Sequence, residues 1–461
     1  MKQKRGQWAS NIGFVLAAAG SAVGLGNIWK FPGKTGAYGG GAFLVCYILI
    51  VALIGFPVML AELSIGRATQ KNVVGALREL NRKWAFAGAL GVVTLFIIMS
   101  YYSIVGGWVM KYVAAYLTGP GFGADGLSYQ EYFVDFITRP AEPLIWGLIF
   151  LVLCIYVVVK GVSDGIEKVS KVLMPVLFLL LLACVVRAVT LPGAKEGVSF
   201  MLTVKPESFN RNTLVGALGQ AFFSLSVGMG IMVTYGSYVP KEANLVKSAA
   251  WICVLDTLVA ILAAFAIIPV VFVTLGEEKL GMGGGFAFMA LPEVFDSLPG
   301  GRFFGLAFFT LLFLAALTSA ISVLESCVAY VTEEWHISRW KASIGLALPM
   351  SVFSIGYSLS QSDARGINLP WFDFTTGVQM LPMNAVLEKF TDNLMIPFGA
   401  LCYCLFVGWV WGRDKASAEI TSGGRYPFRL RRLWEMAVRY AAPAVILLIL
   451  YFTVGKGQGL S

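Results

Sequence analysis

The chain has 461 residues, of which 57% are hydrophobic and 13% are charged, and its formal net charge is +9 at pH 7. Soluble domains carry about 25% charged residues, so this composition excludes an ordinary soluble enzyme and predicts an all-α polytopic membrane protein. The Lys and Arg residues cluster in particular loops, which favours the positive-inside rule over nucleic-acid binding as the cause of the net charge.

The membrane spans follow from the apolar runs, because a spanning helix needs about 20 predominantly apolar residues. We expect eleven transmembrane helices, at residues 11–34, 40–66, 86–117, 143–159, 166–189, 213–237, 248–275, 303–331, 340–359, 383–412 and 438–455. The basic loops all fall on the side of the N-terminus. We therefore expect a cell-membrane protein with a cytoplasmic N-terminus, an extracytoplasmic C-terminus and no removable signal peptide.

The first span is interrupted halfway along its length. Its apolar run contains glycines, polar residues and a proline, which are Gly20, Gly24, Gly26, Asn27, Lys30 and Pro32. Glycine weakens a helix, and the polar side chains are costly in lipid. Backbone opens at membrane depth only where protein or a water-filled cavity satisfies its polar groups. We expect a broken helix whose freed amides and carbonyls serve a ligand, with a glycine-lined packing helix as the alternative.

The sixth span carries a second interruption, since Ser224, Ser226, Gly228 and Gly230 fall at its middle. The two interrupted spans occupy corresponding positions in two halves of five helices each. Paired interruptions of this kind point to a transporter binding site. We expect a single transporter domain over 1–461 with a 5+5 repeat, in which repeat one covers 8–189, repeat two covers 213–412, and 438–455 is an additional helix.

The loop at residues 281–301 is apolar and helix-capable. Three consecutive glycines, Gly283 to Gly285, precede its apolar part, Phe286 to Pro292. The residues fit equally well a lid over the outer face and a plug packed on the bundle.

Several blocks of the sequence resemble the neurotransmitter:sodium symporter family. They are Trp8 to Asn11, Ala18 to Pro32, Gly39 to Phe43, Pro57 to Arg67, Gly219 to Gly228, Thr234 to Tyr238, and Leu317 to Ser319. Eleven expected spans and a Gly165-x9-Pro175 motif in span five resemble the bacterial multi-hydrophobic amino acid transporter branch. The resemblance implies a leucine-transporter-like inverted repeat with discontinuous helices 1 and 6.

The resemblance also implies how a whole amino acid is held. The amides of Leu25 and Gly26 begin a half-helix and suit the carboxylate, and the hydroxyl of Tyr102 donates to the same group. The alternative role for Tyr102 is that of an aromatic residue at the membrane interface. Gly24 stands where monoamine carriers have an aspartate. Its lack of a side chain resembles the amino-acid carriers.

Carbonyls near Ala22, Phe223 and Ser226 would take the substrate ammonium. By the same resemblance, the substrate side chain would contact Ile98, Phe223, Met229, Ala320 and Val323. Met229 replaces a bulkier phenylalanine of the leucine carrier and adapts its shape readily, which favours several apolar or aromatic substrates. Ordinary core packing gives the same residue types.

Two sodium ions are expected from the family pattern, and no organic cofactor. The first ion would bind Ala22, Asn27, Ser224 and, in span seven, Asp256; the second would bind Gly20, Val23, Ala315, Thr318 and Ser319. The register of span seven depends on a poorly aligned loop. Asp256 is nevertheless the only charge between Lys247 and Glu277, and a lone carboxylate at that depth costs about 3 kcal/mol or more.

Asp256 also bears on chloride. Relatives use chloride or a glutamate one turn later as a fixed negative charge, and that later position is Ala260 here. We expect chloride-independent transport in which Asp256 supplies the charge and takes up a proton on the empty return step.

The resemblance assigns gates on both sides. The cytoplasmic gate would consist of Arg5, Trp8, Tyr238 and Glu333, and the outer gate of Lys30 with Glu388, for which Asp392 is a rival. Gly165 and Pro175 would let the cytoplasmic half of span five unwind, with an ordinary proline kink as the alternative.

The expected function is sodium-coupled import of hydrophobic or aromatic L-amino acids by alternating access. An amino-acid-sensing membrane receptor with the same site is the alternative. We expect no enzymatic activity, because no nucleophile–base pair stands out, and a channel would need a continuous polar lining. The expected partners are the small-molecule amino acid and the lipid bilayer, with no nucleic acid and no obligate protein partner.

Overall fold

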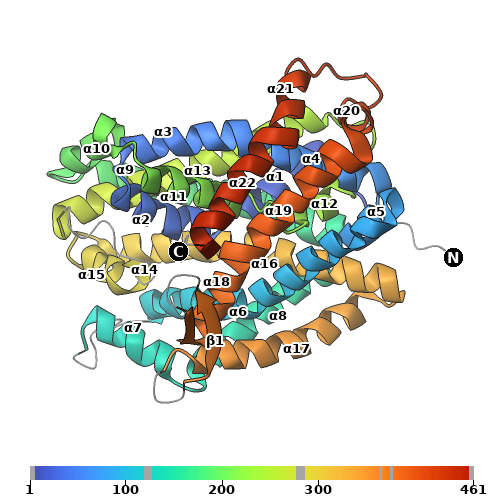
Figure 1. The fold of residues 1–461 in the computed structure, drawn as a ribbon. Coiled ribbons are helices and arrows are strands. Elements are labelled where there is room, and N and C mark those ends of the chain that lie inside the picture. The colour runs from blue at the N-terminus through green and yellow to red at the C-terminus, as the bar shows by residue number, and fades with distance from the viewer. Residues whose placement is uncertain (1–5, 119–126, 277–285, 363–365, 374–376, 456–461) are drawn as a thin grey trace.

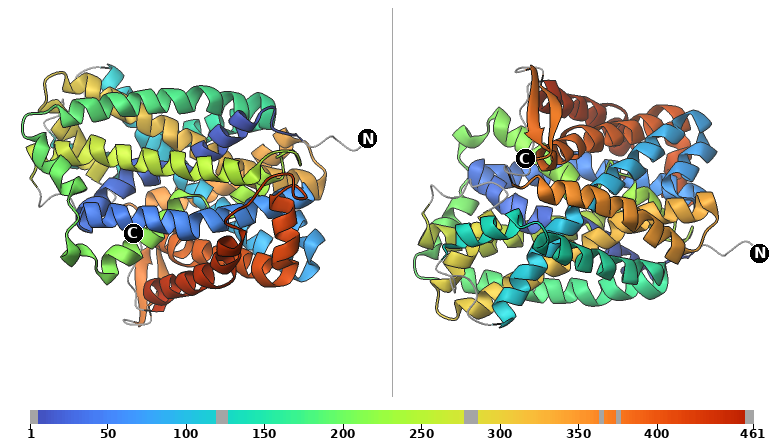
Figure 2. Two further views of the ribbon diagram at one scale, coloured as in Figure 1. Left: turned by 90° about the horizontal axis from the view of Figure 1, so that it is seen from above. Right: turned by 90° about the horizontal axis from the view of Figure 1, so that it is seen from below.

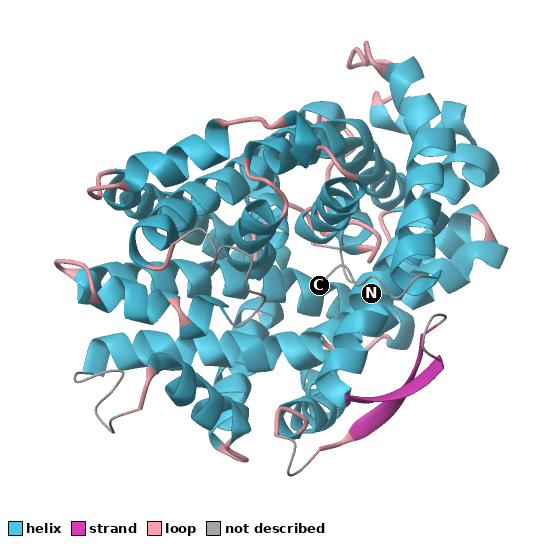
Figure 3. Cartoon of the chain, turned by 60° about the vertical axis from the view of Figure 1, so that its left-hand side comes forward, coloured by secondary structure: helices cyan, strands magenta, loops and turns pink. Residues whose placement is uncertain are grey.

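The computed structural model of the protein describes residues 6–118, 127–276, 286–362, 366–373 and 377–455. Long helices lie side by side, most of them along one axis, and a two-stranded sheet sits at the edge of this bundle (Figures 1, 2 and 3). Helices α5 (Val73–Leu80), α20 (Arg413–Ile420) and α21 (Arg431–Met436) lie at the end from which the N-terminus emerges (Figure 1). The opposite end holds α2 (Phe31–Ala37), α10 (Ala194–Leu202), α14 (Phe286–Met289) and α15 (Leu291–Asp296).

The elements follow in chain order. They are α1 (Asn11–Ala22), η1 (Gly26–Lys30), α2 (Phe31–Ala37), α3 (Gly41–Ile50), η2 (Val51–Gly55), α4 (Phe56–Thr69), α5 (Val73–Leu80), η3 (Arg82–Trp84), α6 (Ala85–Thr118), α7 (Tyr129–Thr138), α8 (Glu142–Val159), η4 (Val162–Glu167), α9 (Lys168–Val189), α10 (Ala194–Leu202), η5 (Pro206–Ser208), α11 (Arg211–Ser224) and α12 (Ile231–Gly236). The second half comprises α13 (Leu245–Thr274), α14 (Phe286–Met289), α15 (Leu291–Asp296), α16 (Gly301–Trp335), α17 (Arg339–Leu359), β1 (Asn368–Asp373), β2 (Gly377–Pro382), α18 (Met383–Lys389), η8 (Phe390–Met395), α19 (Ile396–Leu405), η9 (Phe406–Gly412), α20 (Arg413–Ile420), α21 (Arg431–Met436), η10 (Ala437–Ala441), α22 (Ala442–Leu450) and η11 (Tyr451–Gly455).

Within the described ranges, nine continuous helices are long and apolar enough to cross a membrane. They are Gly41–Thr69, Arg82–Thr118, Glu142–Val159, Val162–Val189, Leu245–Thr274, Gly301–Trp335, Arg339–Leu359, Met383–Ile420 and Arg431–Val454. Each begins and ends within a few residues of an expected span, apart from the last two, of which one continues to Ile420 and the other begins at Arg431. The all-α polytopic fold class is confirmed.

The first and sixth spans are discontinuous, as expected. Helices α1 and α2 are bent by 54° at the break before Gly26, and together they count as a tenth span. The sixth span is divided into α11 and α12 by the segment Leu225–Gly230, so it is too interrupted to count as one helix. The expected total of eleven spans is therefore not fully confirmed.

Backbone conformation explains why the sixth span breaks where it does. Ser226, Gly228 and Gly230 have φ values of 53°, 88° and 81°, which place all three in the left-handed region. Glycine adopts this region without steric cost, whereas a residue with a side chain does so only under constraint. The alternation of small residues thus ends α11 and lets the chain turn into α12.

Small residues also set the distance between α4 and α12. A Cβ atom at Gly66 would lie 1.9 Å from the carbonyl oxygen of Val233, and one at Gly236 would lie 2.6 Å from that of Leu63. Both obstacles are backbone atoms, which cannot move aside without shifting a helix. This close approach is typical of helices that pack inside membranes.

The apolar segment of the 281–301 loop packs on the bundle where the structure describes it. Phe288 of α14 is fully buried, and its ring lies 5.2 Å from that of Trp29 and 5.1 Å from that of Phe133. The described part therefore has the packing expected of a plug. Gly283 to Gly285 lie outside the described residues.

The β-hairpin was not expected from the sequence. Strands β1 and β2 pair antiparallel, from Asn368 opposite Pro382 to Asp373 opposite Gly377. The hairpin joins α17 to α18 at the edge of the bundle (Figure 3).

The start of the fifth span is helical. Gly165 lies in η4, a π-helical segment that leads directly into α9, and Pro175 lies inside α9. A wider π-helical turn often marks a functional site. The unwinding of this segment stays a prediction.

Gly66→Ala should destabilise the protein, because the added methyl group would overlap the carbonyl oxygen of Val233. Overpacking of this kind costs about 1–3 kcal/mol. Thermal unfolding of the detergent-purified protein should show a midpoint several degrees lower. The control is Gly345→Ala in α17, where a Cβ atom would meet nothing within 4 Å. An equal loss in both variants would contradict the argument.

Candidate functional site

The two broken spans meet, and side chains of span six satisfy backbone carbonyls of span one. The Gln220 side chain of α11 donates through Nε2 to the carbonyl oxygen of Gly26 at 3.0 Å. The hydroxyl of Ser226 donates to the carbonyl oxygen of Ser21, also at 3.0 Å. Asn27 donates from Nδ2 to Ser224 Oγ at 2.9 Å. The break in span one is thus held by side chains of span six, and Asn27 joins the two spans through a side-chain hydrogen bond.

A small cavity lies at this junction. Its lining residues are Ala22, Gly24, Leu25, Gly26, Asn27, Ile98, Tyr102, Phe223, Ser224, Ser226, Met229, Ile231, Ser319 and Val323. The cavity measures about 30 Å³, which accommodates a water molecule but not an amino acid. The amide nitrogen of Leu25 donates to the hydroxyl of Tyr102, which lies on α6, at 3.4 Å.

One expected substrate contact does not line this small cavity, and its role stays a prediction. Ala320 is fully buried but does not line the cavity, whereas Ser319 and Val323 do. Those two residues are four apart and share a face of α16, while Ala320 is rotated by about 100° from Ser319. Ile231 lines the cavity and had not been expected, because it lies beyond the break at the first position of α12.

Asp256 lies in the middle of α13, beside the junction, and is fully buried. Its carboxylate accepts hydrogen bonds from Asn27 Nδ2 at 2.7 Å and from Ser224 Oγ at 2.8 Å. The hydroxyl of Tyr47 donates to the same carboxylate at 3.1 Å. All three donors are neutral, so this carboxylate is solvated by dipoles and not by a positively charged side chain.

Helix α16 approaches the first break with its polar residues. A Cβ atom at Gly20 would lie 3.2 Å from Thr318 Cβ, and one at Gly24 would lie 3.1 Å from both Ser319 Oγ and the Tyr102 hydroxyl. The hydroxyl of Thr318 donates to carbonyl oxygens of its own helix, including that of Ala315 at 3.1 Å. Gly20 and Thr318, both expected around a second ion, are therefore neighbours across α1 and α16, and Ser319 lies beside the first break.

Glu62 is a buried residue that sequence reasoning did not assign to the site. It lies on α4, and its Oε1 accepts from the amide of Gly228, inside the second break, at 2.5 Å. Its second oxygen has no hydrogen-bond partner among the described atoms. The position was visible within a block that resembles the family, but its contact with the break depends on the tertiary fold.

The outer ion pair differs from the expected one. Lys30 Nζ lies 3.1 Å from Asp392 Oδ2, whereas Glu388 accepts a hydrogen bond from the Tyr357 hydroxyl at 2.7 Å. The pairing of Lys30 with Glu388 is thus wrong in this structure. The wider π-helical turn η8 begins at Phe390, between the two acids, and rotates Asp392 relative to Glu388.

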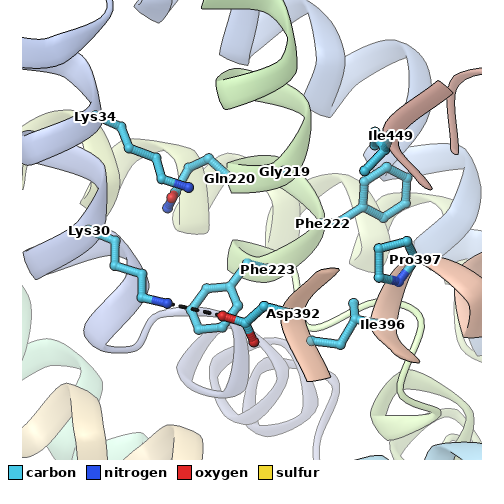
Figure 4. A pocket seen from close by; sticks show the side chains of 10 residues that line it. All are labelled: Lys30, Lys34, Gly219, Gln220, Phe222, Phe223, Asp392, Ile396, Pro397 and Ile449. Carbon is cyan, nitrogen blue, oxygen red and sulfur yellow. Dashed lines mark hydrogen bonds and ion pairs between the residues drawn. The ribbon is translucent and has the colours of Figure 1, made fainter. Parts of the chain in front are cut away.

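Phe223 separates the inner cavity from the outer gate. It lines both the inner cavity and a second one, of about 20 Å³, whose other lining residues are Lys30, Lys34, Gly219, Gln220, Phe222, Asp392, Ile396, Pro397 and Ile449 (Figure 4). The Lys30 ammonium lies 4.5 Å from the centre of the Phe223 ring. Both cavities are too small for an amino acid, so the outer route is closed.

The end of the bundle beside the N-terminus is closed by aromatic and charged side chains. Trp8 is buried, donates from Nε1 to the carbonyl oxygen of Tyr235 at 3.1 Å, and packs its ring against Tyr238. The Tyr238 hydroxyl donates to buried Glu325 at 2.8 Å, and Glu325 forms an ion pair with Arg339.

The structure describes only one of the two charged residues that were expected to pair at this gate. Arg5 lies outside the described residues. Glu333 accepts hydrogen bonds from the amide and the side chain of Asn72, at 2.8 and 3.0 Å. The Glu325–Arg339 pair had not been expected from the sequence, since only the fold brings it under Tyr238.

Comparison with known proteins identifies the family. A family model described as "Sodium:neurotransmitter symporter family" matches residues 5–121 and 137–460. The chain belongs to this family. An uncharacterised sodium-dependent transporter of Bacillus subtilis, YhdH, is 37% identical over 98% of this chain and 99% of its own length. An uncharacterised sodium-dependent transporter of Haemophilus influenzae is 33% identical over 97% of this chain and 98% of its own.

The fold agrees with a solved relative. The crystal structure of MhsT in complex with L-phenylalanine superimposes with a TM-score of 0.86 and 38% sequence identity, covering 96% of this chain and 99% of that one. The sodium symporter family, the sodium-dependent relatives and this fold make the protein a multi-pass, sodium-coupled membrane transporter.

Asp392→Asn should loosen the outer gate, because it removes the charge that pairs with Lys30. A partly exposed pair is worth about 1 kcal/mol at most, so the open population should rise by up to about fivefold. The measurement is the alkylation rate of a cysteine introduced by Ile396→Cys, with a membrane-impermeant maleimide, in a Cys46→Ser background. Glu388→Gln is the matched control and should change the rate less. Equal rates in the two variants would contradict the assigned pair.

Proposed function

We propose that this transporter imports hydrophobic and aromatic L-amino acids together with two sodium ions by alternating access. The observation that carries the proposal is the enclosed cavity at the junction of two broken helices. The residues at the start of a half-helix, a tyrosine and several apolar residues all line this one space. That combination suits a ligand with both a charged head and an apolar side chain.

The head group would bind at the first break. Leu25 and Gly26 stand where the half-helix η1–α2 begins, and free amides at a helix start favour a carboxylate. The Tyr102 hydroxyl, beside the Leu25 amide, would donate to the same group. Gly24 adds no carboxylate of its own, so the substrate supplies that charge. Carbonyls of Ala22, Phe223 and Ser226 would accept from the ammonium.

The apolar wall would determine the side chain of the substrate. Ile98, Phe223, Met229 and Val323 line the cavity together. Methionine is unbranched and has three rotatable bonds, so it adjusts to ligands of different shape. A structural relative, MhsT, was solved with L-phenylalanine, which supports an aromatic or large apolar substrate here.

A first sodium ion would bind between the cavity and Asp256. A buried carboxylate surrounded only by neutral donors favours a cation beside it. Asn27 and Ser224 already contact Asp256 and line the cavity, so a sodium ion there would also meet the substrate carboxylate. Asp256 would supply the fixed negative charge that relatives obtain from chloride or from a glutamate one turn later, where this chain has Ala260. Transport would therefore be chloride-independent.

A second sodium ion would bind between α1 and α16. Carbonyl oxygens of Gly20, Val23 and Ala315 and the hydroxyls of Thr318 and Ser319 are the proposed ligands. Their proximity across the two helices supports this site. Opening of the inner gate at Trp8, aided by unwinding near Gly165, would release the second ion to the cytoplasm, on the side of the N-terminus.

The function is tested by uptake of labelled phenylalanine into proteoliposomes under an inward sodium gradient. Accumulation should require sodium, fall to the background in potassium, and persist in chloride-free buffer. Counter-flow of labelled substrate should also occur without a gradient. Binding without counter-flow would instead make the protein a receptor.

Two adjacent tyrosines provide a matched pair for the substrate site. Tyr102→Phe removes the hydroxyl beside Leu25 and should raise KM for phenylalanine about tenfold, because a hydrogen bond to a charged group is worth about 1.5–3 kcal/mol. Tyr101→Phe removes a hydroxyl that contacts Thr391 and should change KM little. Similar KM values for the two variants would argue against the proposed head-group site.

Asp256→Asn should abolish most sodium-driven uptake in chloride-free buffer, because the variant lacks the fixed charge that balances the first ion. Chloride should restore part of that uptake. Ser224→Ala, which keeps the carboxylate, should weaken sodium affinity without creating a chloride requirement. Equal uptake by Asp256→Asn and the parent in chloride-free buffer would exclude this role for Asp256.

A further inference from the structure

A second charged hollow lies far from the substrate cavity, between the last two spans at the end of the bundle where α20 and α21 lie (Figure 1). Its lining residues are Arg413, Asp414, Arg431, Arg432, Glu435, Met436, Arg439 and Tyr440, and its volume is about 560 Å³. None of these residues lines the cavity at the helix breaks. Transport as proposed makes no use of this hollow.

The charges of the hollow do not balance. Its two acids are already occupied, because Asp414 pairs with Arg431 at 2.5 Å and Glu435 pairs with Arg431 at 2.7 Å and with Arg413 at 3.5 Å. In the part of the chain that the structure describes, Arg432 and Arg439 form no ion pair. Two positive charges therefore remain beside a hollow that would accept an anion.

Arg439 is held in a fixed position without an acidic partner. Its backbone carbonyl accepts from Trp409 Nε1 at 3.2 Å, and its guanidinium lies 4.2 Å from the centre of the Trp409 ring. Gly408 makes room for this arrangement, because a Cβ atom there would lie 2.9 Å from Arg439 Cγ. Arg439 Nε is buried and has no hydrogen-bond partner among the described atoms.

The surroundings of the hollow are those of a membrane interface. Trp409 is 53% exposed and Tyr440 is 55% exposed, and aromatic side chains of this kind gather at the level of lipid headgroups. Exposed Leu447, Leu448 and Tyr451 continue along the same spanning helix, Arg431–Val454. A ligand with a charged head in the hollow would thus have an apolar surface for its tail.

We propose that this hollow binds the phosphate headgroup of an anionic phospholipid, with Arg432 and Arg439 as the principal contacts. Guanidinium groups donate in a planar fork that suits phosphate oxygens. Basic pockets between spanning helices on the cytoplasmic side recognise anionic headgroups. A free phosphate ion would use the same arginines but not the exposed apolar surface. An acidic peptide would likewise have no need of that apolar surface.

The site is tested with the detergent-purified full-length protein and short-chain phosphatidylglycerol, with the thermal unfolding midpoint as the measurement. The midpoint should rise with phosphatidylglycerol and rise much less with phosphatidylcholine or inorganic phosphate. Each arginine near an anionic headgroup contributes about a fivefold gain in affinity. The double variant Arg432→Gln/Arg439→Gln should therefore weaken the apparent affinity by about 30-fold.

The matched control also removes two positive charges, at a place outside the hollow but at the same end of the bundle. Arg82 and Lys83 are exposed and lie outside the hollow, so Arg82→Gln/Lys83→Gln should keep the parent's response. Arg432→Gln alone, at an exposed position, should show about a fivefold loss and guards against misfolding of the double variant. Equal responses to the two lipids, an equal response to inorganic phosphate, or an unchanged affinity in the double variant would each overturn the proposal. The measurement uses neither sodium nor substrate, so its outcome does not depend on the proposed transport.

Discussion

The architecture depends on one constraint, which is that backbone opened inside a membrane must find its hydrogen bonds within the protein. Side chains of span six meet this need in span one, and a side chain of α4 meets it in span six. Gln220 binds the carbonyl of Gly26, and Ser226 binds that of Ser21. Glu62 accepts from the amide of Gly228. The break in span one therefore depends on span six, and the break in span six depends on α4, which ties both halves of the chain to one site.

Asp256 places a buried negative charge at that junction. Three neutral donors from three other helices converge on its carboxylate, so the negative charge is stabilised but not neutralised. Neutral hydrogen bonds lower the cost of burying a charge, while a cation that binds beside it gains the remaining electrostatic energy. A sodium ion bound beside Asp256 would interact at once with the substrate carboxylate, with the broken spans and with helix α13.

Hydropathy located the spans, because about 20 apolar residues are needed to cross a bilayer and few loops imitate that length. Glycine and serine at membrane depth located both breaks. Pairings between distant side chains were harder to predict. Glu388 and Asp392 stand one turn apart, and only the π-helical turn between them decides which one meets Lys30. The Glu325–Arg339 pair and the β-hairpin likewise depend on tertiary packing, which periodicity does not report.

The ammonium of Lys30 makes two contacts at once, with the carboxylate of Asp392 and with the ring of Phe223. Withdrawing Lys30 breaks both, and so frees the ring that divides the outer cavity from the inner one. The two contacts that close the outer cavity therefore depend on one side chain, so any change that moves the Lys30 ammonium alters the ion pair and the position of the ring together.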